Sequence, residues 1–179
     1  MSFARVRALV VVGVLAVAAV VFVVVALVRD TQGDAVAGGG CPDGSPMANL
    51  ALPDDPEQVT VKVYNGTKTP GKADAVSNEF KNRRFRTEKP AENKKKVSGV
   101  AVMRYGPEAV GSAWLLRAYF LDEADVQYDP KRKGAVVDIV VGSNFSQLAT
   151  TTEVNQSLAA QGEPELPPGA CLAPAKKDS

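Results

Sequence analysis

Residues 59–80 read VTVKVYNGTKTPGKADAVSNEF, and this stretch decides the fold. Val59, Val61 and Val63 alternate with polar residues, so they fall on one face of an extended chain, which is typical of a half-buried strand. The Asn-Gly and Pro-Gly pairs that follow indicate a loop. Apolar residues then recur at helical spacing over 73–80, so the stretch predicts a strand, a loop and a helix.

The same patterns continue downstream and predict one more helix and four more strands. A Gly-Pro pair opens the second helix, which is expected over 106–121 and places Trp114 in the core. The order of elements is βαββαββ over residues 58–145, which predicts the α+β class and a small two-layer sandwich of about 90 residues. The further strands are expected at 85–88, 99–105, 126–128 and 135–141.

Charge is segregated along the chain. The sequence has 21 Lys and Arg residues against 20 Asp and Glu residues, but residues 59–145 hold 16 basic and 10 acidic side chains. Residues 30–57 carry six acidic and no basic side chains, and residues 146–179 carry four acidic and two basic ones. The predicted domain is therefore a basic body between acidic arms.

An N-terminal apolar run predicts a membrane anchor. Residues 8–28 contain no charged or strongly polar side chain, and a helix of this length spans about 30 Å, the thickness of a bilayer core. Arg5 and Arg7 precede the run, so the positive-inside rule places residues 1–7 in the cytoplasm and the rest of the chain outside. We therefore expect a single-pass plasma-membrane protein, a transmembrane helix followed by an extracytoplasmic domain.

The rival interpretation of the apolar run is a cleaved signal peptide, since Ala35 and Ala37 form the small-x-small pattern that a signal peptidase recognises. The run is longer than a usual signal core, and the pattern lies several polar residues beyond its end, so we expect the helix to be retained. Residues 29–57 are rich in Gly, Pro and Asp and predict a flexible linker. Residues 146–179 predict a C-terminal arm with a short helix around 154–160.

Histidine is absent from the chain, and its absence weighs against an enzyme. Histidine is the commonest general base and the commonest zinc ligand, and it is the partner in Ser-His and Cys-His catalytic pairs. The carboxylates, lysines and two cysteines that remain fall in no recognisable catalytic or metal-binding spacing. The sequence therefore predicts a protein that is not an enzyme and that requires no cofactor.

Cys41 and Cys171 flank the predicted domain and are the two cysteines of the chain. With the expected topology, both face an oxidising compartment, where a disulfide between them is the obvious pairing. The bond would close a loop of more than 100 residues, for which the chain-entropy model gives about 5 kcal/mol of stabilisation. Two unrelated thiols in flexible arms are the alternative.

Basic residues within the domain gather in three short runs. An extracytoplasmic domain excludes nucleic acid as a partner, and the same charges fit anionic lipid headgroups or cell-wall polymers that carry phosphate or carboxylate. A solvated, charged surface explains the runs equally well. The candidate ligand-binding residues are Lys81, Arg83, Arg84, Lys94, Lys95, Lys96, Lys131, Arg132 and Lys133.

The loop between the first strand and the first helix is a candidate anion site. It ends at the expected N-terminus of the helix, where free backbone N–H groups and two lysines offer an anion several partners. Asn-Gly is also an ordinary turn, and backbone conformation alone explains these residues, so we favour the structural explanation. The candidate residues are Asn65, Gly66, Thr67, Lys68, Gly71 and Lys72.

Several segments resemble one known family, the LytR C-terminal domain of actinobacterial and related cell-envelope proteins. Residues 61–71, VKVYNGTKTPG, are similar to the strand and the NGT-x-x-PG loop that open the family's domain. Residues 102–105, and residues 137–145, which read VDIVVGSNF, are similar to its middle and closing strands. The family usually continues after Pro-Gly with an apolar residue, whereas Lys72 follows here.

The resemblance implies an accessory role in cell-envelope integrity. Members of the family often carry this domain behind a phosphotransferase that attaches glycopolymers to the cell wall, and we expect this chain to lack that catalytic domain. We expect a non-enzymatic, membrane-anchored module that binds an anionic envelope component or an envelope protein. The alternative is an accessory regulator of a cell-wall glycopolymer transferase that acts in trans.

Overall fold

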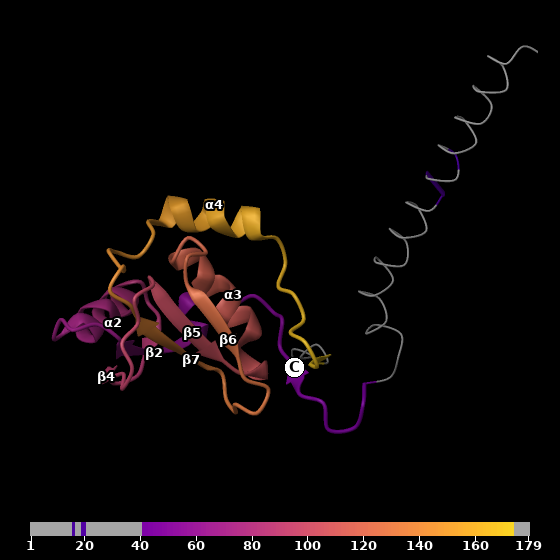
Figure 1. Cartoon of the computed structure of the whole chain (residues 1–179), viewed down its shortest axis with the longest axis horizontal. Coiled ribbons are helices and arrows are strands. Elements are labelled where there is room, and N and C mark those ends of the chain that lie inside the picture. Colours follow the sequence, from indigo (N-terminus) through magenta and orange to yellow (C-terminus); the bar gives the residue numbers. More distant parts are fainter. Residues whose placement is uncertain (1–15, 17–18, 21–40, 174–179) are drawn as a thin grey trace, which may run out of the picture. The chain divides into compact units, whose positions relative to one another are not determined.

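The computed structural model describes residues 16, 19–20 and 41–173. The chain divides into two compact units, Met1–Asp43 and Gly44–Ser179, and the fold described below is that of the second unit (Figure 1). Within the described residues, no helix is long and apolar enough to cross a membrane. The predicted membrane helix over 8–28 lies outside the described residues except at Ala16, Ala19 and Val20.

A six-stranded mixed sheet forms the centre of the second unit. Its strands are β2 Thr60–Asn65, β3 Arg86–Thr87, β4 Ala91–Glu92, β5 Ala101–Tyr105, β6 Asp125–Tyr128 and β7 Val136–Val141. The strand order is β3-β2-β7-β5-β6, and β4 also pairs with β2. The expected alternation is present in β2, where Val61 and Val63 are fully buried and Lys62 and Tyr64 are half-buried.

Two helices connect neighbouring parallel strands of this sheet. α2 Lys72–Asn82 links β2 to β3, and α3 Val110–Tyr119, which follows the 3-10 turn η2 Pro107–Ala109, links β5 to β6. β7 joins these two βαβ units, since it pairs parallel to β2 and antiparallel to β5. The predicted α+β class is confirmed, whereas the order over residues 60–141 is βαβββαββ, with one strand more than the predicted βαββαββ.

One apolar core holds both helices on the same face of the sheet. The inward-facing residues of β2, β5 and β7 pack against α2 and α3. Phe80 of α2 is fully buried, and its ring meets the ring of Phe85 edge-on, with 5.3 Å between the ring centroids. The sheet and these helices form two layers, and their core includes Val61, Val63, Val76, Phe80, Met103, Leu116, Phe120, Val137 and Ile139.

The strand expected over 85–88 is present as the shorter β3, and a second short strand, β4, follows it. β3 pairs with the first half of β2 and β4 pairs with its second half, while Glu88, Lys89 and Pro90 lie between them. β4 falls where the sequence predicts a lysine-rich loop. A two-residue strand contains no alternation that a sequence pattern can detect.

A third helix, α4 Thr151–Gln161, covers the outer side of α3 (Figure 1). Thr150 caps it with a capping box: the Thr150 hydroxyl accepts from the Glu153 backbone N–H at 3.4 Å, and the Glu153 carboxylate accepts from the Thr150 backbone N–H at 2.7 Å. Val154 of α4 packs against Ala118 of α3. The helix begins three residues earlier than expected and adds a partial third layer to the predicted sandwich.

The segments before and after the domain pair with each other. β1 Met47–Ala48 and β8 Cys171–Leu172 form a parallel two-stranded sheet. Ala48, Val110 and Ala170 form a small apolar core beside it. This part of the expected linker therefore contains regular structure and contacts the domain.

The disulfide expected between Cys41 and Cys171 is confirmed. Both residues are disulfide-bonded, and they are the two cysteines of the chain. Because Cys171 belongs to β8, the bond secures the C-terminal arm.

Candidate anion-binding site

A cleft lies beyond the carboxyl ends of the parallel strands β2 and β7, the position where α/β sheets commonly bind ligands. Its volume is about 410 Å³. Three loops line it, within residues 66–72 between β2 and α2, 96–98 before β5 and 142–145 after β7. The candidate anion loop of the sequence therefore forms one wall of a cleft.

Asn65 organises this loop from the inside. Its side chain makes four hydrogen bonds, and the residue is 2% exposed. Nδ2 donates to the Thr69 carbonyl oxygen at 2.9 Å and to the Glu92 carboxylate at 3.0 Å. Oδ1 accepts from the backbone N–H and the hydroxyl of Thr67 at 2.9 and 2.8 Å. Since the protein uses every donor and both lone pairs of this amide, Asn65 holds the loop and does not contact a ligand.

Gly66 and Gly142 allow three chain segments to meet at the base of the cleft. A Cβ at Gly66 would lie 2.7 Å from the Val141 carbonyl oxygen, and a Cβ at Gly142 would lie 2.0 Å from the Gly99 carbonyl oxygen. Side chains do not fit at such distances, so the backbone packing requires glycine at both positions. This packing explains the glycine of the NGT sequence.

Lys68 and Lys72 of one loop and Lys96 of another line the cleft. Lys96 Nζ donates to the Thr67 carbonyl oxygen, and Lys72 Nζ lies 5.2 Å from the centroid of the Phe145 ring. Among the described residues, no Asp or Glu lines the cleft, and no group of His, Cys, Asp and Glu is placed to hold a metal ion. Three like charges gathered without a counter-charge suit the binding of an anion.

The cleft opens at the N-terminus of α2. Gly71 is the N-cap residue, with a φ of 74°, and it offers no side chain to the free N–H groups of the first turn. The helix dipole makes this end positive, and Lys72 adds a charge of the same sign at the first helical position, offset in part by Asp74. A cation at a helix N-terminus destabilises the helix, whereas an anion there stabilises it. Lys72 is therefore unfavourable for the helix itself and favourable for binding an anion.

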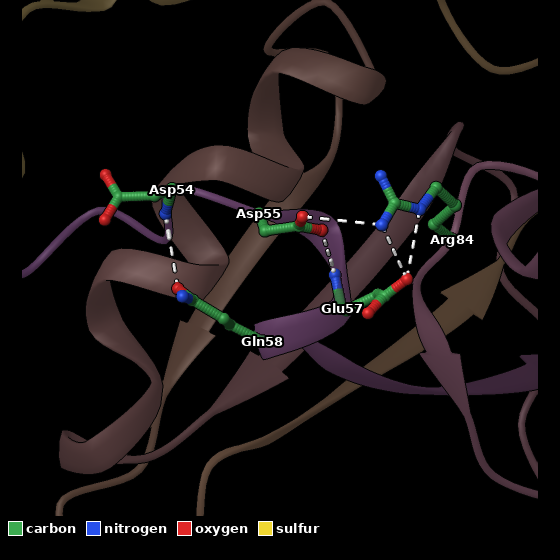
Figure 2. A network of polar contacts seen from close by, with 5 residues as sticks. All are labelled: Asp54, Asp55, Glu57, Gln58 and Arg84. Atoms are coloured by element: carbon green, nitrogen blue, oxygen red, sulfur yellow. Dashed lines mark hydrogen bonds and ion pairs between the residues drawn. The ribbon is translucent and has the colours of Figure 1, made fainter.

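Two of the candidate arginines bind other parts of the domain. Arg84 pairs with Glu57 at 2.8 Å and with Asp55 at 3.6 Å (Figure 2), and the hydrogen bond to Glu57 raises the pKa of Arg84. Arg83 donates to the carbonyl oxygen of Ala149. Both guanidinium groups therefore secure the segments that flank the domain.

Arg132 is also bound within the domain. Its guanidinium lies 2.8 Å from one carboxylate oxygen of Asp138 and 2.9 Å from the other. The hydrogen bond to Asp138 raises the pKa of Arg132. This pair fixes the turn between β6 and β7, and Lys131 and Lys133 on either side are exposed.

The nine candidate basic residues do not form one surface. Residues 81–84 and 131–133 precede β3 and β7, whose first residues pair with the start of β2. Residues 94–96 follow β4, which pairs with the end of β2. Of the nine, Lys96 lines the cleft, where it joins two lysines of the candidate anion loop. The exposed lysines among the nine that lie outside the cleft are Lys81, Lys94, Lys95, Lys131 and Lys133.

Sequence reasoning misses several residues of the cleft. Ser98, Ser143 and Phe145 line it, and the Ser143 hydroxyl donates to the Ser98 carbonyl oxygen at 3.2 Å. No spacing rule connects these residues to the Asn-Gly loop. The available signal was the pair of valine-rich strands, since parallel pairing places the residues after both strands at one edge of the sheet.

Comparisons with known proteins identify a family. The family model described as LytR cell envelope-related transcriptional attenuator matches residues 58–145. No curated protein matches the chain. Among solved structures, the soluble domain of a conserved hypothetical secreted protein from Mycobacterium marinum is similar at a TM-score of 0.48 and 20% identity, covering 68% of this chain and 83% of that one. The matched residues comprise both βαβ units and β7, so residues 58–145 form a domain of the LytR C-terminal domain family.

Proposed function

We propose that this protein is a non-enzymatic, membrane-anchored module on the outer side of the cell envelope, and that its cleft binds an anionic envelope component. The observation that carries the proposal is the meeting of Lys68, Lys72 and Lys96 at the uncapped N-terminus of α2. The described lining of the cleft contains no acidic residue to balance them. The expected ligand groups are the phosphates or carboxylates of an anionic lipid or of a cell-wall polymer.

The cleft offers an anion several favourable interactions. The lysine ammonium groups and the free N–H groups of the first turn of α2 all donate to anionic oxygens, and hydrogen bonds of this charged kind contribute about 1.5–3 kcal/mol each. Val97 and Phe145 line the same cleft. These apolar side chains favour a ligand that carries an apolar or ring-shaped group next to its charge.

Three observations support a position outside the cytoplasm. The disulfide between Cys41 and Cys171 is of a kind that persists in oxidising compartments. The family is named for the cell envelope. The apolar run over 8–28 has the length of a membrane span and follows two arginines, which favours a cytoplasmic N-terminus.

Co-sedimentation tests the binding. A fragment of residues 40–179 would be mixed with anionic vesicles, with neutral vesicles and with a purified anionic cell-wall polymer, across a series of salt concentrations. We expect binding to the anionic materials that weakens as salt rises, because salt screens exposed charges. Replacing Lys68, Lys72 and Lys96 with Gln should lower the affinity at least tenfold, since each lysine near an anionic surface contributes about 1 kcal/mol.

The matched control replaces Lys81, Lys94 and Lys95 with Gln. These lysines are exposed and lie outside the cleft, so the control removes the same charge from other positions. An equal loss of binding in both variants would reject the cleft as the site. Failure to bind either anionic material would reject anion binding and favour the alternative, a regulator that co-purifies with a glycopolymer transferase and alters its rate.

A further inference from the structure

A second cavity lies at the opposite end of the sheet, beyond the carboxyl end of β5. Its volume is about 270 Å³. Tyr105, Trp114 and Tyr128 give its walls three aromatic side chains, and Arg117 and Glu165 give them two charged ones. The sequence predicts Trp114 in the core, but the residue is half-buried and lines this cavity instead.

The aromatic wall is held in place by its own contacts. Trp114 Nε1 donates to a backbone carbonyl oxygen of the segment after α4 at 3.1 Å, and the Arg117 guanidinium lies 4.6 Å from the centroid of its ring. Arg117 Nε in turn donates to the Asp122 carboxylate at 2.6 Å. The centroids of the Tyr105 and Tyr128 rings lie 5.8 Å apart. A wall fixed in this way loses little side-chain freedom when a ligand binds.

Polar groups accompany these rings. The Tyr128 hydroxyl is buried and makes no hydrogen bond within the described part of the chain. Burial raises the pKa of Tyr105 and of Tyr128, so both hydroxyls keep their protons near neutral pH. Buried hydroxyls in native proteins nearly always have a partner, so the unpartnered Tyr128 hydroxyl distinguishes this wall from an ordinary apolar core.

The charges of this cavity do not favour an anion. Arg117 is paired with Asp122, and Glu165 adds a negative charge to the wall. A purely apolar ligand would cover the Glu165 carboxylate without offering it a hydrogen bond, which is unfavourable. A pyranose ring matches both features, because one of its faces presents C–H groups and its rim presents hydroxyls.

We propose that this cavity binds a neutral sugar ring of a glycan, packed against Trp114, Tyr105 and Tyr128, with Arg117 and Glu165 hydrogen-bonded to its hydroxyls. The volume lies below the range of about 300–1,000 Å³ that is usual for pockets of drug-sized ligands, so the cavity suits a single ring. The site is separate from the lysine cleft, and either site can fail without the other.

Trp114 is the single tryptophan of the chain, so its fluorescence reports this cavity directly. Full-length protein in a zwitterionic detergent without sugar headgroups would be titrated with maltotriose, mannotriose, galactotriose and chitotriose. Sodium phosphate and a proline-rich peptide would be titrated separately. We expect a saturable change in emission with at least one trisaccharide and no change with phosphate. A saturable response to the peptide alone would overturn the proposal and indicate a protein partner, and the lack of any saturable response to the sugars would overturn it as well.

Two variants of the C-terminal arm make the test specific. Glu165→Gln should weaken the sugar affinity about tenfold, because it replaces a charged hydrogen-bond acceptor in the wall. Glu163→Gln is the matched control, since Glu163 is exposed on the same arm and lies outside the cavity. Equal affinities of the two variants would reject the contact with Glu165. The variant with Lys68, Lys72 and Lys96 replaced should keep its response to sugar.

Discussion

The two strand-to-helix crossings of the sheet, β2 to α2 and β5 to α3, share a topology but differ at the helix N-terminus. At the start of α3, the chain that enters the domain supplies the partners: the Gly111 N–H donates to the Asn49 carbonyl oxygen at 3.0 Å, and the Asn49 N–H donates to the Pro107 carbonyl oxygen at 2.9 Å. At the start of α2, Gly71 supplies no side-chain cap and Lys72 lines an open cleft. Free N–H groups at a helix N-terminus need partners. The β2–α2 crossing, where the protein supplies no side-chain cap, is therefore the one suited to an anionic ligand.

The glycines next to the two helix N-termini also differ in how closely the backbone packs around them. A Cβ at Gly111 would lie 2.0 Å from the Ala51 carbonyl oxygen, and a Cβ at Gly106 would lie 2.4 Å from the Arg132 carbonyl oxygen. A Cβ at Gly71 would meet nothing within 4 Å. The β5–α3 crossing is therefore closed by backbone at its helix, whereas the β2–α2 crossing is closed at Gly66 but open at Gly71, where its helix begins.

The largest effect is expected from removing the disulfide, which tests whether the closed crossing depends on the C-terminal arm. Replacing Cys41 and Cys171 with Ser should lower the free energy of unfolding by about 4 kcal/mol, because the bond closes a very long loop. Denaturant unfolding measures this loss. The Cys171 N–H donates to the Pro46 carbonyl oxygen at 2.8 Å, and Asn49 of the same segment accepts the hydrogen bond of the Gly111 N–H. Loss of the disulfide should loosen this segment, so hydrogen exchange of the Gly111 N–H should become faster. Loss of anion binding in the same variant would show that the two crossings are not independent.

A smaller loss of stability is expected from adding a side chain to the tightly packed β5–α3 crossing. Gly111→Ala should destabilise the domain by about 3 kcal/mol, because its new methyl group overlaps the Ala51 carbonyl oxygen and forces the backbone apart. The control is Gly71→Ala, which meets no neighbour and should cost about 1 kcal/mol through its positive φ. Thermal unfolding of both variants measures the difference. Equal costs would show that the crossings are packed alike.

Asn65→Ala tests whether the open crossing is held by its own loop. The variant removes four hydrogen bonds, and we expect a loss of about 2 kcal/mol in stability because the Thr67 and Glu92 groups that Asn65 contacts lose a partner. Anion binding should fall with it, since the cleft loses its wall. Asn144→Ala, at an exposed position, serves as the control. Full anion binding by Asn65→Ala would mean that the loop does not shape the site.

The smallest change in stability, and the sharpest separation of stability from binding, is expected at the two ends of α2. Lys72→Glu should leave stability unchanged or raise it by about 0.5 kcal/mol, because an anion at a helix N-terminus is favourable, while anion binding falls at least tenfold. Lys81 lies in the last turn of the same helix, so Lys81→Glu should destabilise by about 0.5 kcal/mol and leave binding intact. Paired unfolding and co-sedimentation measurements check both. A clear loss of stability in Lys72→Glu would assign Lys72 a structural role.

The parts of the fold that the sequence predicts are those whose pattern is local. The alternation of Val59, Val61 and Val63 and the helical spacing that ends at Phe80 each arise from one element, and the structure contains both elements. β1, β4 and β8 are two residues long, and such strands have no period. They form because distant segments meet, which no local pattern encodes.

The candidate site shows the same limit. The sequence identifies the Asn-Gly loop and the run that contains Lys96 as separate features, and parallel pairing of β2 with β7 and with β4 brings them to one cleft. It also groups Arg83 and Arg84 with Lys81, although tertiary contacts with Ala149 and Glu57 engage both arginines. A run of like charges therefore indicates charge density, and the pairing of strands decides which charges act together.

The broken strand beside β2 also bears on how copies of the domain behave when crowded. β3 and β4 form the outer edge of the sheet there, and each is two residues long. Pro90 lies between them and has no N–H to donate, so no continuous row of donors and acceptors runs along this edge. Exposed, unbroken edge strands are the usual template for aggregation. This edge is therefore protected from strand-to-strand pairing between neighbouring molecules, however closely they are packed.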